Sequence, residues 1–285
     1  MSIKLKHLFA LALLAGATTA ASAGDSENLA AVLAAQPEDV QARYVWRHPQ
    51  ETLEFFDIAP GMTVVEVLPG AGWYTKILLP YIGADGGYVA ADYAVSMWPL
   101  FGFFSEEFIA GKADWPQQFT AEAEGWGGEN GPSVAAFAFG SLPEGLKGTA
   151  DAVLLIRALH NLARFESQGG YLTAALQDVY DLLKPGGVVG VVQHQARDDM
   201  PDDWANGSNG YLKQGFVIAA MEQAGFEYIG STEINQNPKD QPTVDDMVWR
   251  LPPSLATSKD NPELRAEMEA IGESNRMTLK FRKPL

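Results

Sequence analysis

Two carboxylates and two glycines are spaced in a way that could bind a nucleoside. Glu66 lies near the end of an apolar run, and Gly70 and Gly72 follow it in a short loop. Asp92 ends the next apolar run. Glycines let a backbone approach a ligand closely, and an acid that ends the second strand of a parallel sheet can accept both hydroxyls of a ribose. The pattern therefore describes an adenosine site.

Each part of this pattern also has a simpler interpretation. A glycine pair alone is typical of a turn between a strand and a helix, and most aspartates lie at the surface. The loop does not match the sequence G-x-G-x-x-G, which argues against a nicotinamide dinucleotide as the ligand. The combination of loop, strand and terminal acid is what favours the adenosine site.

Histidines are the candidates for acid–base chemistry. Beyond residue 23 the chain contains His48, His160 and His194. We expect His160 and His194 to follow two strands at the edge of the sheet where ligands bind. A histidine there can act as a general base because its ordinary pKa lies near neutral pH. We predict His160 as the base or orienting group and His194 as the second candidate, with a structural histidine as the alternative for each.

The neighbours of His160 indicate how a substrate could be held. Arg157 and Asn161 flank this histidine. A guanidinium recognises carboxylates and phosphates, and an amide can bind other polar groups. We therefore expect Arg157 and Asn161 to bind an anionic or polar acceptor. His48, Arg47 and Tyr44 are a weaker candidate for a lid formed by the N-terminal helices.

A metal site is the alternative use of the two histidines. Two imidazoles and a carboxylate would suit a divalent ion, so a metal-dependent hydrolase is one hypothesis. The spacing matches no known ligand motif, and we expect no metal. We interpret the aspartates that follow His194 as a solvated acidic loop: Asp198, Asp199, Asp202 and Asp203.

These residues need a scaffold of alternating strands and helices. The apolar middle strands are typical of a parallel sheet that is covered on both faces. We predict a single α/β domain over residues 24–285, with a helical N-terminal extension over 24–60 and a doubly wound, mostly parallel sheet. The aromatic segment 93–131 is predicted as a helix plus an irregular insertion. Strands are expected at 62–68, 88–91, 134–139, 151–157, 188–192, 226–231 and 277–282, and the later helices at 164–183, 211–224 and from 262.

Residues 1–23 have the features of a secretory signal peptide. Lys4 and Lys6 precede an apolar stretch, and Ala21-Ser22-Ala23 offers a cleavage site. The stretch is shorter than the ~20 residues that a membrane span requires. No cysteine follows the cleavage site, which excludes a lipoprotein. We expect a periplasmic or secreted protein without stable membrane association.

Composition narrows the classes of function further. The chain has no cysteine, so it has no disulfide, no thiolate zinc site and no thiol nucleophile. Its formal net charge is −16, and a surface this acidic repels phosphate backbones. We therefore expect no nucleic-acid partner.

Three segments resemble class I S-adenosylmethionine (SAM)-dependent methyltransferases. "VVEVLPGAG" (64–72) is similar to their first motif, with Glu66, Gly70 and Gly72 in the matching positions and Leu68 where the first glycine is usual. Residues 142–162 and 183–194 resemble the segments that lead into the fourth and fifth strands. The resemblance covers roughly residues 40–285. It implies a Rossmann-like seven-stranded fold, SAM as the cofactor, and Tyr74 as a further cofactor-binding residue.

A narrower resemblance is to a bacterial family of exported, predicted methyltransferases. "RHPQETLEFF", "PGAGWYT", "RALHN" and "IGESNRMTLKF" carry it. The chain departs from the pattern at Ala158 and Gln193, where Asn and an acid are usual. In the wider class an acid often follows the third strand, whereas Phe139 lies there in this chain.

The leading hypothesis is a SAM-dependent methyltransferase that acts on a small-molecule or peptide acceptor. SAM is made in the cytoplasm, and a chain exported unfolded cannot carry it across the membrane. The alternative is therefore a non-catalytic periplasmic binding protein on a methyltransferase-like scaffold, which Leu68 and the missing adenine-binding acid favour. The acceptor and the oligomeric state are not fixed by the sequence.

Overall fold

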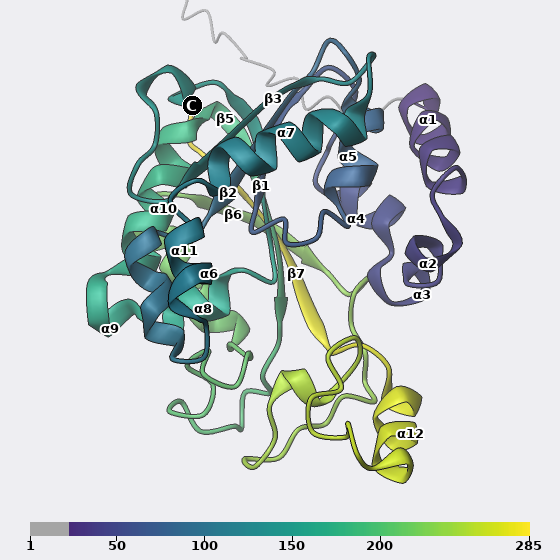
Figure 1. Cartoon of the computed structure of the whole chain (residues 1–285), viewed down its shortest axis with the longest axis vertical. Coiled ribbons are helices and arrows are strands. Elements are labelled where there is room, and N and C mark those ends of the chain that lie inside the picture. Colours follow the sequence, from purple (N-terminus) through teal and green to yellow (C-terminus); the bar gives the residue numbers. More distant parts are fainter. Residues whose placement is uncertain (1–22) are drawn as a thin grey trace, which may run out of the picture.

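A seven-stranded sheet forms the centre of the molecule (Figure 1). The computed structural model describes residues 23–285, so the predicted signal peptide lies outside the described residues except for Ala23. The strands run in the order β3-β2-β1-β4-β5-β7-β6. Their bounds are β1 Thr63–Val67, β2 Gly87–Asp92, β3 Ser133–Ala138, β4 Ala150–Ile156, β5 Leu183–His194, β6 Glu227–Thr232 and β7 Arg276–Arg282.

The sheet is mostly parallel, as predicted. β1 pairs in parallel with β2 and β4, while β2 pairs with β3 and β4 with β5 in the same sense. Only β7 runs antiparallel, between β5 and β6. The strand order reverses between β1 and β4, so the carboxyl ends of these strands form the edge where doubly wound sheets bind ligands.

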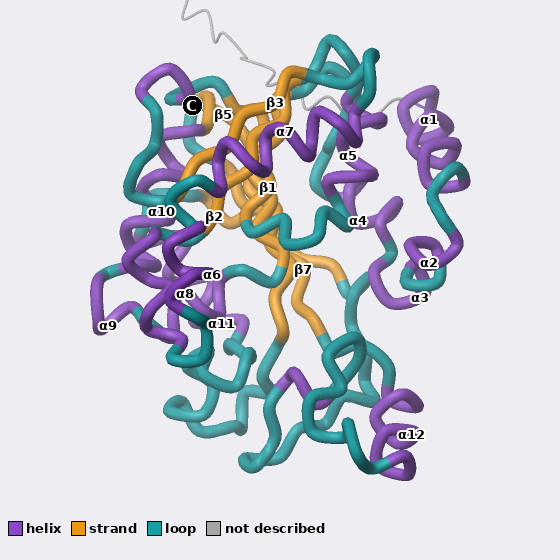
Figure 2. The backbone as a smooth tube through the Cα atoms, in the orientation of Figure 1, coloured by secondary structure: helices purple, strands orange, loops and turns teal. Residues whose placement is uncertain are grey.

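Helices cover both faces of the sheet (Figures 1 and 2). One apolar cluster joins α1, α4, α5 and α7 to one face, and the other joins α8, α10 and α11 to the opposite face. Within residues 23–285, no helix combines the length and the apolar character needed to cross a bilayer. The helices are α1 Ala23–Ala34, α2 Glu38–Gln41, α3 Tyr44–Arg47, α4 Pro49–Phe55, α5 Thr75–Ile82, η1 Val95–Phe101, α6 Glu106–Gly111, α7 Trp115–Gly127, η2 Glu144–Leu146, α8 Leu159–Arg164, α9 Glu166–Gly169, α10 Tyr171–Leu182, α11 Gln214–Gln223, η3 Val248–Arg250 and α12 Pro262–Ile271.

Three elements differ from their predicted form. The segment 93–131 is largely helical, because η1, α6 and α7 occupy most of it. The helix predicted over 164–183 is divided at Gly170, which adopts a φ of 67° that interrupts helical geometry. The helix predicted from residue 211 begins at Gln214. The predicted start of the last helix is confirmed, since the Asn261 side chain accepts a hydrogen bond from the backbone N–H of Leu264.

The chain between β6 and β7 and the loop after β5 build a lobe beyond the carboxyl edge of the sheet. Figure 1 shows α12 and the surrounding loops past the end at which β7 begins. A buried ion pair holds this lobe together, with 2.9 Å between Arg250 Nη2 and Asp240 Oδ1. The Tyr211 hydroxyl also donates to Asp240. The lobe therefore has its own polar centre beside the main core.

We expect Gly190→Ala to destabilise the fold. A Cβ at this position in β5 would lie 2.5 Å from Cδ2 of Phe56, a fully buried ring at the end of α4. The ring cannot yield without a shift of α4, and overpacking of this kind costs about 1–3 kcal/mol. Urea unfolding measures the change. Gly215→Ala in α11 is the control, because its Cβ would meet no atom within 4 Å and alanine should stabilise the helix by up to about 1 kcal/mol. Equal stability for both variants would contradict the expectation.

Candidate functional site

The glycine loop between β1 and α5 has three residues in the left-handed backbone region. Leu68, Gly70 and Gly72 have φ values of 59°, 58° and 76°. A left-handed conformation costs a leucine about 1–2 kcal/mol. The loop thus keeps the backbone shape of a glycine motif at a position that holds leucine. At Gly70 there is open space for close approach, since an added Cβ would meet nothing within 4 Å.

Gly72 is covered by an aromatic ring of the protein itself. A Cβ at this position would lie 2.5 Å from Cζ3 of Trp126 in α7. Lys76 also contacts this ring, with its Nζ 4.6 Å from the Trp126 ring centroid. Glycine is therefore required at position 72 for the packing of α7, independently of any ligand.

Glu66 is bound by hydroxyl groups inside the protein. Its Oε2 accepts hydrogen bonds of 2.7 Å from both Thr75 Oγ1 and the Tyr88 hydroxyl. Burial raises the pKa of Glu66 to about 7, although the two hydroxyls act in the opposite direction. The carboxyl group thus links β1 to α5 and β2, and it lies directly before the glycine loop in the chain.

Asp92 lies at the end of β2 as predicted, but its carboxylate is already engaged. Oδ1 accepts from the backbone N–H of Tyr93, and Oδ2 lies 2.8 Å from Lys112 Nζ. Burial raises the pKa of Asp92, and the ammonium group of Lys112 opposes that shift. Lys112 Nζ also lies 3.8 Å from the ring centroid of Trp98. Lys112 therefore covers the position predicted to bind a ribose.

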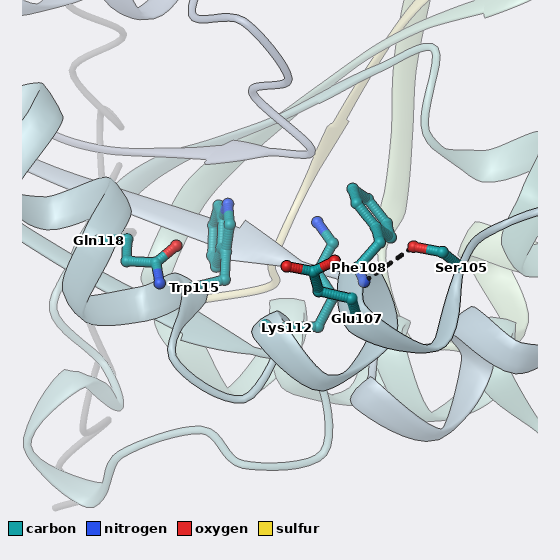
Figure 3. A pocket seen from close by; sticks show the side chains of 7 residues that line it. Ser105, Glu107, Phe108, Lys112, Trp115 and Gln118 are labelled. Atoms are coloured by element: carbon teal, nitrogen blue, oxygen red, sulfur yellow. Dashed lines mark hydrogen bonds between the residues drawn. The ribbon is translucent and has the colours of Figure 1, made fainter.

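A groove of about 380 Å³ lies beside this pair, between α6 and the start of α7. Figure 3 shows Trp115 and Phe108 on either side of Lys112. The volume is within the usual range for small-molecule sites. The insertion after β2 thus supplies both the lysine that covers Asp92 and an open surface next to it. The lining residues are Ser105, Glu107, Phe108, Gly111, Lys112, Trp115 and Gln118.

The two predicted histidines lie together at the carboxyl edge. His160 is in α8, directly after β4, and His194 ends β5. Their ring centroids are 5.5 Å apart. His160 Nδ1 lies 3.3 Å from Gln193 Oε1, and His194 Nδ1 lies 2.6 Å from Ser274 Oγ. The parallel pairing of β4 with β5 brings the two histidines together.

Both histidines are neutral at physiological pH. Burial lowers the pKa of His160 to about 4, and Arg157 contributes to the decrease. Burial also holds the pKa of His194 well below its usual range, with further contributions from His160 and Arg276. Neutral imidazoles can accept or donate hydrogen bonds, but a group with so low a pKa is a weak base.

Of the remaining predicted residues, some act on the two histidines and others support the surrounding structure. Arg157 follows β4 with a φ of 59°, and its charge acts on His160 and His194. Asn161 donates from Nδ2 to the Tyr93 hydroxyl. The buried hydroxyl of Tyr74 donates to the backbone oxygen of Arg47, 3.4 Å away. Tyr74 therefore supports the N-terminal helices in this conformation.

Sequence reasoning missed a group of charges at the same edge. Glu273 accepts hydrogen bonds from Arg43, Arg47 and Arg276. Arg47, which the sequence indicates only as a weaker candidate for a lid, has a side chain that is 3% exposed and pairs with Glu273. These residues lie at opposite ends of the sequence, so no local spacing indicated that they meet.

A metal centre finds no support in the geometry. No three His, Asp or Glu side chains converge on a common point anywhere in residues 23–285. In the acidic loop, Asp199 pairs with Arg197 and Asp202 pairs with Lys213. The loop is thus engaged in surface ion pairs.

Comparison with known proteins identifies the fold. No family model and no curated protein matches the sequence. The cyclase SpnF is 18% identical, with a TM-score of 0.50 over 84% of this chain and 80% of its own. A SAM-dependent methyltransferase from Aquifex aeolicus is 19% identical, with a TM-score of 0.47 over 73% of this chain and 93% of its own.

An arsenic(III) SAM methyltransferase from Chlamydomonas reinhardtii is 15% identical, with a TM-score of 0.48 over 90% of this chain and 73% of its own. The similarity to SpnF, together with the strand order, establishes the fold. The chain has the Rossmann-like, seven-stranded fold that the sequence resemblance to class I methyltransferases implied. At such identities the similarity concerns the fold, and the activity has to be argued from the site.

The raised pKa of Glu66 predicts a stability that depends on pH. The folded protein retains this proton to higher pH than the unfolded chain, because the pKa rises from 4.5 to about 7. The resulting stabilisation is complete below the unfolded pKa and is lost as the pH rises through the folded pKa. Glu66→Gln removes the ionisation and keeps an oxygen that can accept both hydrogen bonds.

Urea unfolding should therefore show the wild type losing up to about 3 kcal/mol relative to Glu66→Gln between about pH 5 and pH 8. Glu267→Gln on the exposed face of α12 is the control. It removes a carboxylate from the surface and leaves the buried site of Glu66 intact. A constant difference for Glu66→Gln would contradict the raised pKa.

Proposed function

We propose that the protein is a SAM-dependent methyltransferase that acts on a small-molecule or peptide acceptor. The observation that carries the proposal is the combination of a left-handed glycine loop after β1 with a buried acid at the end of β2. These two features lie at the edge where doubly wound sheets bind ligands. The fold and the sequence resemblance support the same activity.

The residues at this edge fit the cofactor in part. The open space at Gly70 allows close approach of a ligand, and Asp92 has the position of a ribose-binding acid. Lys112 would have to leave Asp92 for the ribose to bind there. Gly72 would border the cofactor, and Glu66 and Tyr74 would support the loop and the helices around it. When bound, SAM would supply a methyl group on a positively charged sulfur.

The chain itself would hold and orient the acceptor. Arg157 and the two histidines lie at the carboxyl ends of β4 and β5, and β4 pairs with β1, the strand that leads into the glycine loop. A neutral His160 can accept a hydrogen bond from an acceptor hydroxyl or amine, and His194 can orient it. Orientation is the main requirement for such a transfer, since it makes the reaction effectively intramolecular.

A second candidate function is ligand binding without catalysis. Lys112 on Asp92 and Trp126 on Gly72 are the observations that favour it, because both cover the predicted cofactor site. The similar fold of the cyclase SpnF illustrates that this architecture serves more than one reaction. Under this candidate the chain would retain the fold and bind a ligand other than SAM.

We also propose that the protein acts outside the cytoplasm, in the periplasm or the medium. The basic, apolar and small-residue segments of residues 1–23 support this location. Export would require either a supply of SAM outside the cytoplasm or the non-catalytic candidate function.

Asp92→Asn should weaken SAM binding if the carboxylate holds the ribose. The amide keeps the shape of the side chain but loses a charged acceptor, which should raise the dissociation constant by about tenfold or more. Calorimetric titration with SAM and S-adenosylhomocysteine measures the effect. Asp151→Asn is the matched control, because Asp151 forms a similar pair with Lys184 at the opposite edge of the sheet. Undetectable binding to the wild type at millimolar ligand would rule out the methyltransferase.

Lys112→Met should strengthen SAM binding. The methionine keeps the apolar stem against Trp98 and frees the carboxylate of Asp92, so the ribose no longer competes with an ammonium group. We expect about a tenfold lower dissociation constant in the same titration, together with a lower melting temperature from the lost ion pair. Lys184→Met is the control for loss of a lysine–aspartate pair. An unchanged or weaker affinity in Lys112→Met would show that the lysine does not exclude the cofactor.

A further inference from the structure

Four arginines surround a single acid at the carboxyl edge of the sheet. Two come from the N-terminal helical segment, one follows β4, and one begins β7. We call this group the arginine cluster: Arg43, Arg47, Arg157 and Arg276. Its acid is Glu273, whose pKa is about 2 because the guanidinium groups outweigh the effect of burial. In a chain with a net charge of −16, such a concentration of positive charge requires a reason.

Glu273 accounts for only part of the cluster. Arg43 and Arg47 donate from Nε to its carboxylate, at 2.8 and 3.2 Å respectively, and Arg276 donates from Nη2. Arg276 also donates hydrogen bonds to Ser274 Oγ and to the backbone oxygen of Trp46. These contacts join the N-terminal helices to the start of β7, which is a structural role.

Arg157 takes no part in this role. Its guanidinium forms no hydrogen bond and no ion pair with any residue from 23 to 285. It lies close enough to Arg47, Arg276 and Glu273 for their charges to act on it. Burial and the two arginines lower its pKa to about 9, although the carboxylate of Glu273 acts in the opposite direction. A partly buried cation beside two others is a strong electrostatic cost unless an anion compensates it.

Arg47, whose charge acts on Arg157, has unused hydrogen-bonding capacity. Its Nη1 is buried and has no hydrogen-bond partner among the described residues. Nearly all buried polar groups in folded proteins are paired, so an unpaired guanidinium nitrogen indicates a missing partner. The rest of the Arg47 guanidinium lies over the Trp73 ring, 4.4 Å from its centroid, which fixes the side chain in place.

We propose that the arginine cluster binds a carboxylate or phosphate group of a small molecule, held chiefly by Arg157 and by Nη1 of Arg47. Guanidinium groups recognise both oxyanions through paired hydrogen bonds. The cluster has four cations and one anion. A bound oxyanion would offset part of this excess of positive charge. His160 and His194 lie at the same edge of the sheet, after β4 and at the end of β5, with their ring centroids 5.5 Å apart.

The anion site rests on the proposed function in one respect only: as part of a methyltransferase, its ligand would be the methyl acceptor. The binding itself needs no SAM. It would make the acceptor an acidic small molecule, and it would place the charged end of that molecule between the N-terminal helices and β4.

Arg157→Gln tests the site. In calorimetric titrations at constant ionic strength, inorganic phosphate or benzoate should bind the wild type more tightly than chloride does. Arg157→Gln should weaken that binding by about tenfold or more, because hydrogen bonds to a charged group are lost. Without added anion, the melting temperature of the variant should equal or exceed that of the wild type, since an unpaired cation has been removed. A purely structural arginine would show the opposite change.

Two further variants complete the test. Arg157→Lys should retain part of the affinity, because it keeps the charge and loses the planar fork. Arg265→Gln removes an exposed arginine from α12 and should leave anion binding unchanged. A preference for benzoate would assign a carboxylate ligand, and a preference for phosphate would assign a phosphorylated one.

The proposal is overturned if neither anion binds more tightly than chloride, or if Arg157→Gln binds them as the wild type does. A loss of stability in Arg157→Gln with unchanged binding would assign the residue to the fold. These titrations are made without SAM, so a protein that fails to bind SAM can still bind the anions. Failure of the methyltransferase proposal is thereby distinguished from failure of the anion site.

Discussion

One carboxylate holds together parts of the chain that lie far apart in the sequence. Glu273 accepts hydrogen bonds from Arg43 and Arg47 near the N-terminus and from Arg276 near the C-terminus. Truncating a buried acid of this kind leaves its guanidinium partners uncompensated, which is usually far more costly than the pair is worth. The position of the N-terminal helices over the carboxyl edge depends on this contact, and with it the surroundings of Trp73, Tyr74 and the glycine loop.

The same edge combines opposite electrostatic environments. On the β2 side, the buried acid Asp92 is paired with Lys112, whose ammonium group lies over the rings of Trp98 and Phe108. On the β4 side, cations outnumber acids around two neutral histidines. The chain carries a formal net charge of −16, so an anionic ligand would be repelled by the molecule as a whole and attracted at this place. The distribution of charge thus provides selectivity in addition to the contacts themselves.

The fold was largely predictable because its signals are local. Each apolar run became a strand, and the topological rule for parallel sheets placed Asp92, His160 and His194 at one edge. The division of the predicted helix at Gly170 also had a local signal, the pair Gly169-Gly170. The apolar periodicity on both sides of this pair favoured a continuous helix instead. The aromatic residues of 93–131 indicated burial, but they could not indicate which helices would form or that Lys112 would reach Asp92.

The arginine cluster was not predictable for a different reason. Arg43 and Glu273 are separated by 230 residues, and no periodicity or motif connects them. Only the strand order, with β7 beside β5, brings Arg276 next to His194. Leu68 shows the reverse case, in which the sequence departs from a motif while the backbone retains the left-handed shape.

The place of β7 in the sheet also determines the order in which the molecule can be completed. β7 comes last among the strands in chain order, yet it lies between β5 and β6. During synthesis both of those strands have an unpaired edge until residues 276–282 are available. Contacts so distant in sequence form slowly, and Arg276 and Glu273 belong to the same late segment. A nascent chain therefore cannot close its sheet until the segment that contains β7 has been synthesised.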